Sequence, residues 1–289
     1  MRSPGHDATE VTEVSDQEVR RPIVAAAIQM TSTDDVEQNL DDAHRLIRDA
    51  ANRGASLIVL PELFTVLGEP EVIAAEAQQV PGPASRMLAG WAEELDVTLV
   101  AGSLAERREG HQRISNTSLV FGPRGEQLGC YRKIHLFDIN LPGEVSFCES
   151  AFVEPGDEIV VCDTPAGRIG QATCYDLRFP ELFRELVDRG AEIIVVPSAF
   201  TQATGRDHWE VLLRARAIEN QVFVVAPNQF GHHAPGITTY GRSVIIDPWG
   251  TVLATAPDGE AVITAPLDFQ RQHHIRKTLP ALKHRRLTH

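Results

Sequence analysis

Three side chains that could take part in covalent chemistry, Glu62, Lys133 and Cys174, each stand just after a short segment with the residue pattern of a β-strand. In α/β sheets, active sites form beyond the carboxyl ends of strands, so three such positions can converge on one site. A thiol needs a base, and no histidine lies in the segment around Cys174, so a carboxylate with a raised pKa could serve. A lysine held near that carboxylate could stabilise the negative oxygen of a tetrahedral intermediate.

Cys174 is expected at the junction of a strand, residues 168–173, and a helix that includes residues 183–187. Amide groups at the start of a helix lower the pKa of a nearby thiol and can bind an oxyanion, and the N–H of Tyr175 is the candidate donor. Each residue also has an ordinary alternative explanation. A free cysteine is commonly a small buried apolar group, and a glutamate or lysine in a loop is commonly solvated on the surface.

The composition excludes several classes of function. The chain has 289 residues with 27 Lys and Arg against 40 Asp and Glu, a formal net charge of −13, so we expect neither a nucleic-acid partner nor binding to an anionic membrane. Apolar runs, such as residues 193–196, are far shorter than the ~20 residues of a membrane span. The four cysteines show neither CxxC nor zinc-finger spacing, and we see no apolar signal segment, so we expect reduced thiols in a cytoplasmic protein.

Alternating strand and helix patterns predict an α/β fold, and strand pairs joined by short turns predict mixed sheets. Residues 1–20 are polar and acidic and are expected to be a disordered leader, and residues 21–289 are expected to form one domain with a basic C-terminal tail. A helix is expected from Asp34, with Glu37 as its capping partner. The segment 133–155 is long and irregular, and loops of that length in compact domains are usually functional.

Other elements are expected along the rest of the chain. Residues 114–121 and 127–132 have the pattern of a β-hairpin, and Asp-Pro-Trp-Gly at 247–250 is typical of the turn of another. Residues 197–206 are expected to be a loop that leads into a helix over residues 208–220.

Three short motifs carry the strongest signal in the sequence. They are Pro-Glu-Leu at 61–63, Tyr-Arg-Lys-Ile-His-Leu at 131–136 and Cys-Tyr-Asp-Leu-Arg-Phe-Pro-Glu at 174–181. In order and spacing they resemble the three signatures of the carbon–nitrogen hydrolase (nitrilase) superfamily, and the resemblance extends from about Ile23 to the C-terminal tail. It implies a four-layer α-β-β-α sandwich (nitrilase-like) with two mixed sheets.

The resemblance also implies roles for individual residues. It implies that Glu62 is the general base, Lys133 the oxyanion stabiliser and Cys174 the nucleophile. The superfamily has an accessory carboxylate between the lysine and cysteine motifs, and Glu149 is the residue at the matching position. The alternative for Glu149 is an ordinary carboxylate in a surface loop.

Further segments resemble the branch of the superfamily that holds deaminated glutathione amidase and omega-amidase. Among them are His-Leu-Phe-Asp at 135–138, Cys-Glu-Ser at 148–150 and His-Trp-Glu-Val-Leu-Leu-Arg-Ala-Arg-Ala at 208–217. The branch implies a thiol amidase that hydrolyses the carboxamide of a small carboxylate-bearing substrate, deaminated glutathione or a related omega-amide, through a thioester on Cys174 with release of ammonia. It implies no metal or organic cofactor, and a homodimer or larger homo-oligomer.

Several other functions stay open. An omega-amidase acting on α-ketoglutaramate-type substrates, a nitrilase and an N-carbamoyl amidohydrolase would keep the same three residues. A redox protein would use Cys174 without Glu62, and a non-catalytic protein of the same fold would use neither. We expect no metal site, because the paired histidines at 232–233 and 273–274 lack a third ligand at a useful spacing.

An arginine near the thiol would suit a substrate with a carboxylate, and Arg178 lies four residues after Cys174. A guanidinium group can bind a carboxylate through two parallel hydrogen bonds, so Arg178 is the candidate substrate-binding residue. The alternative is an ion pair with Glu181 or Glu185 on the following helix, for which the spacing is equally suitable.

Overall fold

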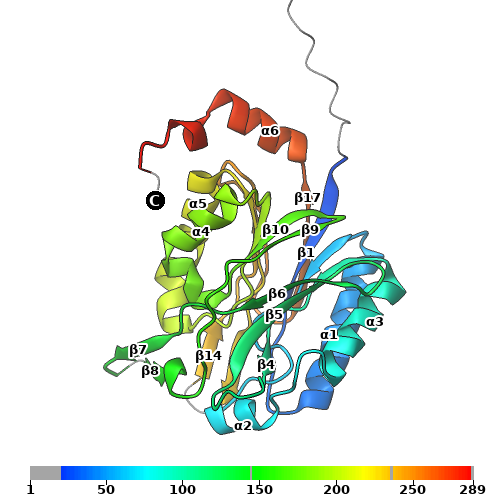
Figure 1. The fold of residues 1–289 in the computed structure, drawn as a ribbon, viewed down its shortest axis with the longest axis vertical. Helices are drawn as coiled ribbons and strands as arrows, with labels where there is room; N and C mark the ends of the chain where they lie inside the picture. The colour runs from blue at the N-terminus through cyan, green and yellow to red at the C-terminus, as the bar shows by residue number, and fades with distance from the viewer. Residues whose placement is uncertain (1–20, 144, 235–236, 288–289) are drawn as a thin grey trace, which may run out of the picture.

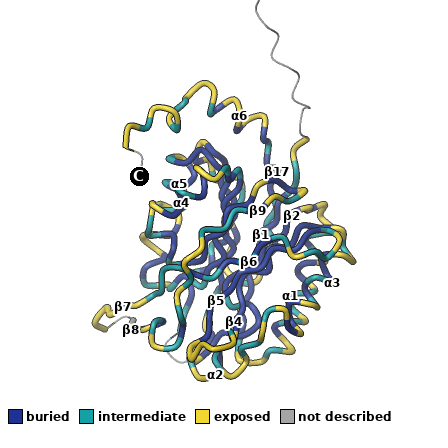
Figure 2. The backbone as a smooth tube through the Cα atoms, in the orientation of Figure 1, coloured by how far each residue is buried: buried dark blue, intermediate teal, exposed yellow. Residues whose placement is uncertain are grey.

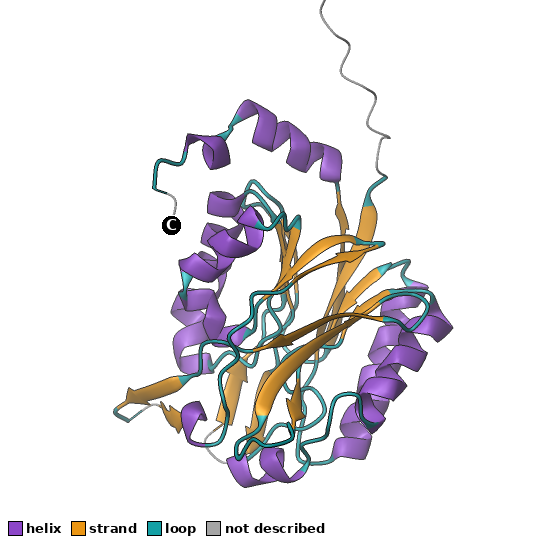
Figure 3. Ribbon diagram, viewed as in Figure 1, coloured by secondary structure: helices purple, strands orange, loops and turns teal. Residues whose placement is uncertain are grey.

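The computed structural model describes residues 21–143, 145–234 and 237–287. Two β-sheets lie face to face in its centre, and helices cover the outer face of each sheet (Figures 1 and 3). This is the α-β-β-α sandwich that the sequence predicted, and both sheets contain parallel and antiparallel neighbours as expected. The predicted leader, residues 1–20, lies outside the described residues, so its separation from a single domain stays a prediction. In the described part of the chain, every helix is too short or too polar to traverse a lipid bilayer.

The first sheet has seven strands in the order β17-β1-β2-β3-β5-β4, and β6 also pairs with β5. Strands β1, β2 and β3 run parallel to one another, whereas the other pairs are antiparallel. Helices α1 and α3 cover the outer face of this sheet. The bounds are β1 (Ile23–Gln29), α1 (Val36–Asn52), β2 (Leu57–Val59), α3 (Pro83–Leu95), β3 (Thr98–Val100), β4 (Leu104–Glu106), β5 (Ser115–Phe121), β6 (Gln127–Arg132) and β17 (Ala261–Leu267).

The second sheet has six strands in the order β16-β15-β12-β11-β10-β9. Strands β10, β11 and β12 are parallel, and the outer pairs are antiparallel. Helices α4 and α5 cover its outer face. The bounds are β9 (Val161–Thr164), β10 (Gly167–Gln171), α4 (Pro180–Asp188), β11 (Ile193–Val195), α5 (Gln202–Asn220), β12 (Phe223–Ala226), β15 (Val244–Ile246) and β16 (Val252–Thr255).

The alternation of side chains along β1 shows how the layers pack. Ala25 and Ala27 belong to the apolar cluster between the two sheets, together with Phe223 of β12. Ala26 and Ile28 point the other way and pack against the apolar face of α1. Both faces of the strand are therefore buried, which is why its sequence is a continuous apolar run rather than an alternating one. Figure 2 shows the same burial for the strands at the centre of the molecule.

Two hairpins were not predicted from the sequence. β7 (Asp138–Leu141) and β8 (Val145–Cys148) pair within the segment 133–155, which was expected to be irregular, and the 3-10 helix η1 (Glu149–Ala151) follows them. β7 is largely exposed, and within the described part of the chain it pairs with β8 alone, so it lacks the alternation of a half-buried strand. β13 (Phe230–Ala234) and β14 (Ile237–Tyr240) form the second hairpin.

Some boundaries also differ from the prediction. The N-cap of α1 is Asp35 rather than Asp34, because the Asp35 carboxylate accepts a hydrogen bond from the amide of Gln38 at 3.0 Å. Glu37 therefore lies in the first turn without the predicted capping role. α5 begins at Gln202, so the segment expected to be a loop already contains its first turn. Four other short or terminal elements complete the fold: α2 (Pro70–Ala75), η2 (Cys174–Arg178), α6 (Phe269–Thr278) and η3 (Ala281–His284).

Candidate active site

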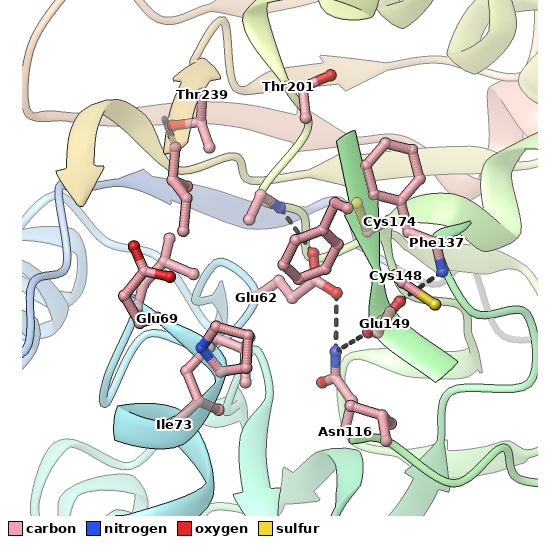
Figure 4. A pocket seen from close by; sticks show the side chains of 18 of the residues that line it. Glu62, Glu69, Ile73, Asn116, Phe137, Cys148, Glu149, Cys174, Thr201 and Thr239 are labelled. Carbon is pink, nitrogen blue, oxygen red and sulfur yellow. Dashed lines mark hydrogen bonds between the residues drawn. The ribbon is translucent and has the colours of Figure 1, made fainter. Parts of the chain in front are cut away.

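A cavity of about 710 Å³ lies where strand ends of the two sheets meet, and it contains the predicted reactive side chains. Glu62, Lys133, Glu149 and Cys174 all line it. Figure 4 shows Glu62, Glu149 and Cys174 close together, with Asn116 beside them. A cavity of this volume is in the range that binds small organic molecules.

Glu62 lies in the loop that follows β2. The next residue, Leu63, has φ 49°, a left-handed conformation that a leucine adopts only under constraint, and its amide donates to the Ser103 hydroxyl at 3.0 Å. The loop also packs directly on Gly102, where any side chain would collide with the carbonyl of Pro61. Glu62 is therefore held in a tightly defined position at the end of the first sheet.

The carboxylate of Glu62 has three hydrogen-bond donors. Oε1 accepts from Asn116 Nδ2 at 2.8 Å and from Lys133 Nζ at 2.9 Å. Oε2 accepts from the amide of Ala199 at 2.8 Å. Ala199 follows β11 of the second sheet, so this one side chain joins the two halves of the sandwich.

Lys133 follows β6 directly, and its ammonium lies between two carboxylates. Besides Glu62, it donates to both oxygens of Glu149, at 3.0 and 2.8 Å. Glu149 is fixed in turn because its Oε2 accepts from the amide of Phe137 at 2.6 Å. The side chains of Lys133, Glu62 and Glu149 are only 2%, 4% and 6% exposed, so all three charges are removed from solvent. The alternative in which Glu149 lies in a solvated surface loop does not agree with this burial.

Burial and mutual attraction set the ionisation of these groups. Burial disfavours the ammonium of Lys133, but the negative charges of Glu149 and Glu62 more than compensate, so its pKa stands well above the ordinary value. Burial raises the pKa of Glu149 despite the opposing effect of Lys133. Burial and the charge of Glu62 raise the pKa of the Cys174 thiol well above its ordinary value, and Lys133 opposes them. The thiol is therefore protonated at rest and needs a proton acceptor in order to attack.

Cys174 stands at the end of the second sheet, three residues after β10, and begins η2 rather than the helix itself. Its φ of 47° lies in the left-handed region, which costs a non-glycine residue on the order of 1–3 kcal/mol and commonly marks a functional position. Its amide donates to the carbonyl of Pro197 at 2.9 Å, and that of Asp176 to the carbonyl of Thr173 at 3.1 Å. Between these two amides in the chain lies the N–H of Tyr175, which has no acceptor among the described residues.

Asp176 connects the Cys174 turn to the Lys133 segment. Its Oδ2 accepts from the hydroxyl of Tyr131 at 2.6 Å and the amide of Thr173 at 2.8 Å. Its Oδ1 accepts from the amide of His135 at 3.1 Å and from Nδ1 of the same histidine at 2.7 Å. The residue is fully buried, so these four bonds fix the turn relative to the end of β6.

Sequence reasoning did not identify Asn116, Asp176 or the amide of Ala199 as parts of the site. A signal for the first was present, because Ser-Asn-Thr-Ser at 115–118 is a polar run inside a strand, and all four residues are buried. Asp176 lies within a recognised motif but has no reactive role of its own. Nothing local marks Ala199, because it contributes only a backbone group.

The structure does not bring every predicted residue to the cavity wall. Neither Tyr175 nor Arg178 is among the lining residues. The Arg178 guanidinium lies 5.7 Å from the centre of the Tyr175 ring and 5.3 Å from that of Phe200, and it is 3.3 Å from Nδ1 of His208. It forms no ion pair with Glu181 or Glu185. Its proposed contact with a substrate stays a prediction.

No group of three or more histidine, cysteine or acidic side chains suited to a metal ion occurs among the described residues. The buried His233 is occupied instead by hydrogen bonds to the carbonyl of Ser32 and the hydroxyl of Thr239, both at 2.7 Å. His232 lies on the surface and contacts the hydroxyl of Thr238 at 2.8 Å.

Comparison with known proteins gives consistent matches along the chain. The sequence profile of the family described as carbon-nitrogen hydrolase matches residues 24–277. Deaminated glutathione amidase of Bos taurus is 43% identical over 270 residues, which cover 92% of this chain and 82% of that protein. Omega-amidase NIT2 of Homo sapiens is 38% identical over 261 residues, which cover 90% of this chain and 94% of that protein.

Two solved structures are informative. Saccharomyces cerevisiae Nit3, described as a member of branch 10 of the nitrilase superfamily, superposes with a TM-score of 0.84 at 32% identity, covering 93% of this chain and 98% of that one. A mutant of the amidase from Nesterenkonia sp. AN1 has a TM-score of 0.75 at 27% identity, covering 92% of this chain and 97% of that one. It carries the acetamide moiety of fluoroacetamide covalently added to its active-site cysteine.

The raised thiol pKa leads to a prediction for Glu62→Gln. Without a proton acceptor, Cys174 must ionise unaided before iodoacetamide can alkylate it. The charge of Glu62 is one cause of the raised thiol pKa and is lost in the variant, but burial, the larger cause, remains and keeps that pKa high. The alkylation rate of the variant should therefore be low at pH 7 and rise by up to ~tenfold per pH unit toward pH 9. The wild type should react faster at pH 7 and depend less on pH. Peptide mass spectrometry separates Cys174 from the exposed Cys148.

Glu69→Gln is the matched control, because Glu69 lines the same cavity without contacting Lys133 or Glu62. It should behave like the wild type. Equal alkylation rates for Glu62→Gln and the wild type across this pH range would show that the thiol does not depend on Glu62.

The Asp176 network predicts a further effect. In Asp176→Asn, the new NH2 group must replace one of the two carboxylate oxygens. In one orientation it faces the backbone N–H of Thr173 and in the other that of His135, so one of these two N–H groups loses its acceptor. The cost should be about 1–3 kcal/mol of unfolding free energy, and the displaced turn should slow alkylation of Cys174 by about tenfold or more. Urea unfolding and the alkylation assay measure the two effects.

Asp247→Asn is the control that separates a loss of stability from a change at the active site. Asp247 is also buried and accepts hydrogen bonds from the amides of Trp249 and Thr251, but it lies in the turn between β15 and β16. We expect a similar loss of stability with unchanged Cys174 reactivity. If both variants slowed alkylation equally, Asp176 would have no special role in positioning the thiol.

Proposed function

The chain belongs to the carbon–nitrogen hydrolase family, and from this premise we propose that it is a thiol amidase with Cys174 as nucleophile. Its substrate is a small carboxylate-bearing amide, deaminated glutathione or a related omega-amide. The observation that carries the proposal is the buried Glu62–Lys133–Glu149 array, which shares one cavity with a protonated thiol. Relatives named deaminated glutathione amidase and omega-amidase support the choice of substrate.

In the first half-reaction, Glu62 accepts the thiol proton as Cys174 Sγ bonds to the carbonyl carbon. The carbonyl π electrons move to the oxygen, where the ammonium of Lys133 and the free amide of Tyr175 stabilise the negative charge. Glu62 then transfers its proton to the departing nitrogen as the C–N bond breaks. A thioester remains on Cys174, and the covalent adduct on the cysteine of the Nesterenkonia amidase supports this attachment.

In the second half-reaction, Glu62 takes a proton from a water molecule that attacks the thioester. The carboxylic acid leaves, and the sulfur of Cys174 regains its proton. Glu149 acts through Lys133, because its two oxygens and the amide of Phe137 keep the ammonium pointing at the reacting oxygen. The leaving group in the first step is ammonia for a primary carboxamide, and an amine when the amide nitrogen is substituted.

The proposal predicts the outcome of a substrate panel. Deaminated glutathione, α-ketoglutaramate, glutamine, an aliphatic nitrile and an N-carbamoyl amino acid are incubated with enzyme, and both ammonia and new amine are measured. One of the first two should be hydrolysed, because the cavity presents a base, a cation and a thiol to its carbonyl. Cys174→Ala should abolish this, and Lys133→Met should lower kcat by about 100- to 1000-fold.

Cys148→Ala is the control, because Cys148 is also a free thiol in the cavity wall. Its activity should stay close to that of the wild type. Hydrolysis of the nitrile or carbamoyl compound alone would replace the proposed substrate but keep the three residues. A folded protein that hydrolyses none of the compounds would favour the non-catalytic alternative.

We also propose that the enzyme is cytoplasmic and forms a homodimer or larger homo-oligomer. All four cysteines are free, as expected for a reducing compartment. Three large apolar side chains are unusually exposed on α5 and the neighbouring turn: Val211 at 68%, Ile218 at 50% and Trp249 at 55%. Exposed apolar groups gathered in this way are typical of contact surfaces between subunits.

The apolar surface of Val211, Ile218 and Trp249 predicts a change in mass. Val211→Glu combined with Trp249→Glu should convert an oligomer to monomers, because a second copy would have to bury two carboxylates. Light scattering after size-exclusion chromatography measures the mass. Leu141→Glu, an exposed apolar residue on β7, should leave the mass unchanged. A monomeric wild type would contradict the proposal.

A further inference from the structure

The charged side chains in the cavity wall are unevenly distributed. Lys133 is held between Glu62 and Glu149, so these three side chains together offer no net positive charge to a ligand. Glu69, on the loop before α2, adds another carboxylate to the wall. Arg206 is the other cation in the described cavity wall.

Arg206 has no hydrogen bond or ion pair with any described residue. It stands in the first turns of α5, and Thr201, Gln202 and Ala203 from the start of the same helix also line the cavity. In Figure 4, Thr201 lies apart from the cluster of Glu62, Glu149 and Asn116. An exposed guanidinium without a protein partner is free to bind an anion from solution.

We propose that Arg206 binds the carboxylate of the substrate and thereby selects amides that carry one. This inference rests on the proposed amidase function and assigns the part of the cavity that recognises the substrate's charge. The reacting amide lies at Cys174, and the carboxylate is directed to the wall formed by the start of α5. The guanidinium can hold both carboxylate oxygens through parallel N–H donors.

Electrostatics favours this orientation over the reverse. A carboxylate placed beside Cys174 would meet the two carboxylates that enclose Lys133, and no unpaired cation is available there among the described residues. A carboxylate near Glu69 would also be repelled. Only the part of the described wall that contains Arg206 offers an uncompensated positive charge.

The same geometry distinguishes Arg206 from Arg178. The Arg178 guanidinium is close to the rings of Tyr175 and Phe200 and to His208, and it is absent from the cavity wall. Arg206 lies in that wall, and among the described residues it has neither a cation–π contact with an aromatic ring nor a hydrogen bond to a histidine. The two arginines therefore give separate, testable hypotheses for recognition of the carboxylate.

The test compares two substrates with the same reacting amide. Glutaramate carries a carboxylate, and its methyl ester has nearly the same shape without the charge. The specificity ratio is kcat/KM for glutaramate divided by kcat/KM for the ester. Arg206→Gln should lower this ratio by about 10- to 100-fold, chiefly through KM for glutaramate, because a charged hydrogen-bonded pair is lost. Arg206→Lys should restore part of it, since a point charge replaces a two-pronged donor.

Two variants serve as controls. Arg86→Gln removes an exposed arginine on α3, outside the cavity wall, and should leave the ratio unchanged. Arg178→Gln tests the competing arginine. If Arg178→Gln lowers the specificity ratio and Arg206→Gln does not, the inference is overturned.

The remaining outcomes separate this inference from the proposed function. If Arg206→Gln lowers hydrolysis of glutaramate and the ester equally, the residue has a structural role and does not select charge. If the wild type hydrolyses neither compound, the proposed amidase function fails for these substrates, and the inference fails with it. If every variant hydrolyses both compounds with the same specificity ratio as the wild type, the inference about Arg206 is overturned and the proposed amidase function stands.

Discussion

The structure depends on the burial of one ammonium group between two carboxylates. Removing the charge of Lys133 from water costs several kcal/mol, and only close, well-aligned partners offset that cost. Glu62 and Glu149 provide them at 2.8–3.0 Å. Each of the three residues comes from a different segment of the chain, so the charges fix the relative positions of β2, β6 and η1. Loss of Lys133 would leave two buried carboxylates without a counter-ion.

The second sheet contributes what this charged array lacks. It supplies the thiol of Cys174 and the Ala199 amide that holds the free oxygen of Glu62. The base is thus shared between the two halves of the sandwich, and Asp176 adds a second connection between them. Because the thiol is buried beside Glu62, its pKa rises and its proton remains in place until a substrate arrives. Burial therefore keeps the nucleophile unreactive at rest and makes the carboxylate necessary.

Much of this arrangement was predictable from local sequence. The apolar runs specify strands that are buried on both faces, and the three motifs each contain one reactive residue at a strand end. The hairpin of β7 and β8 was missed, because β7 is mostly exposed and therefore has no hydrophobic period. Asn116 and Asp176 were missed for another reason. Their role is to position other groups, and such a role depends on neighbours that are distant in sequence.

The sequence by itself determined the layers of the fold and the types of residue available for chemistry, because periodicity and reactive groups are local properties of the chain. It also determined the family, through motifs whose order and spacing are readable without coordinates. Only the tertiary structure decided which groups are within hydrogen-bonding distance, how far each is removed from water, and which arginine lies in the cavity wall. Those properties arise from packing two sheets against each other, which brings Glu62 within 2.8 Å of an amide 137 residues away.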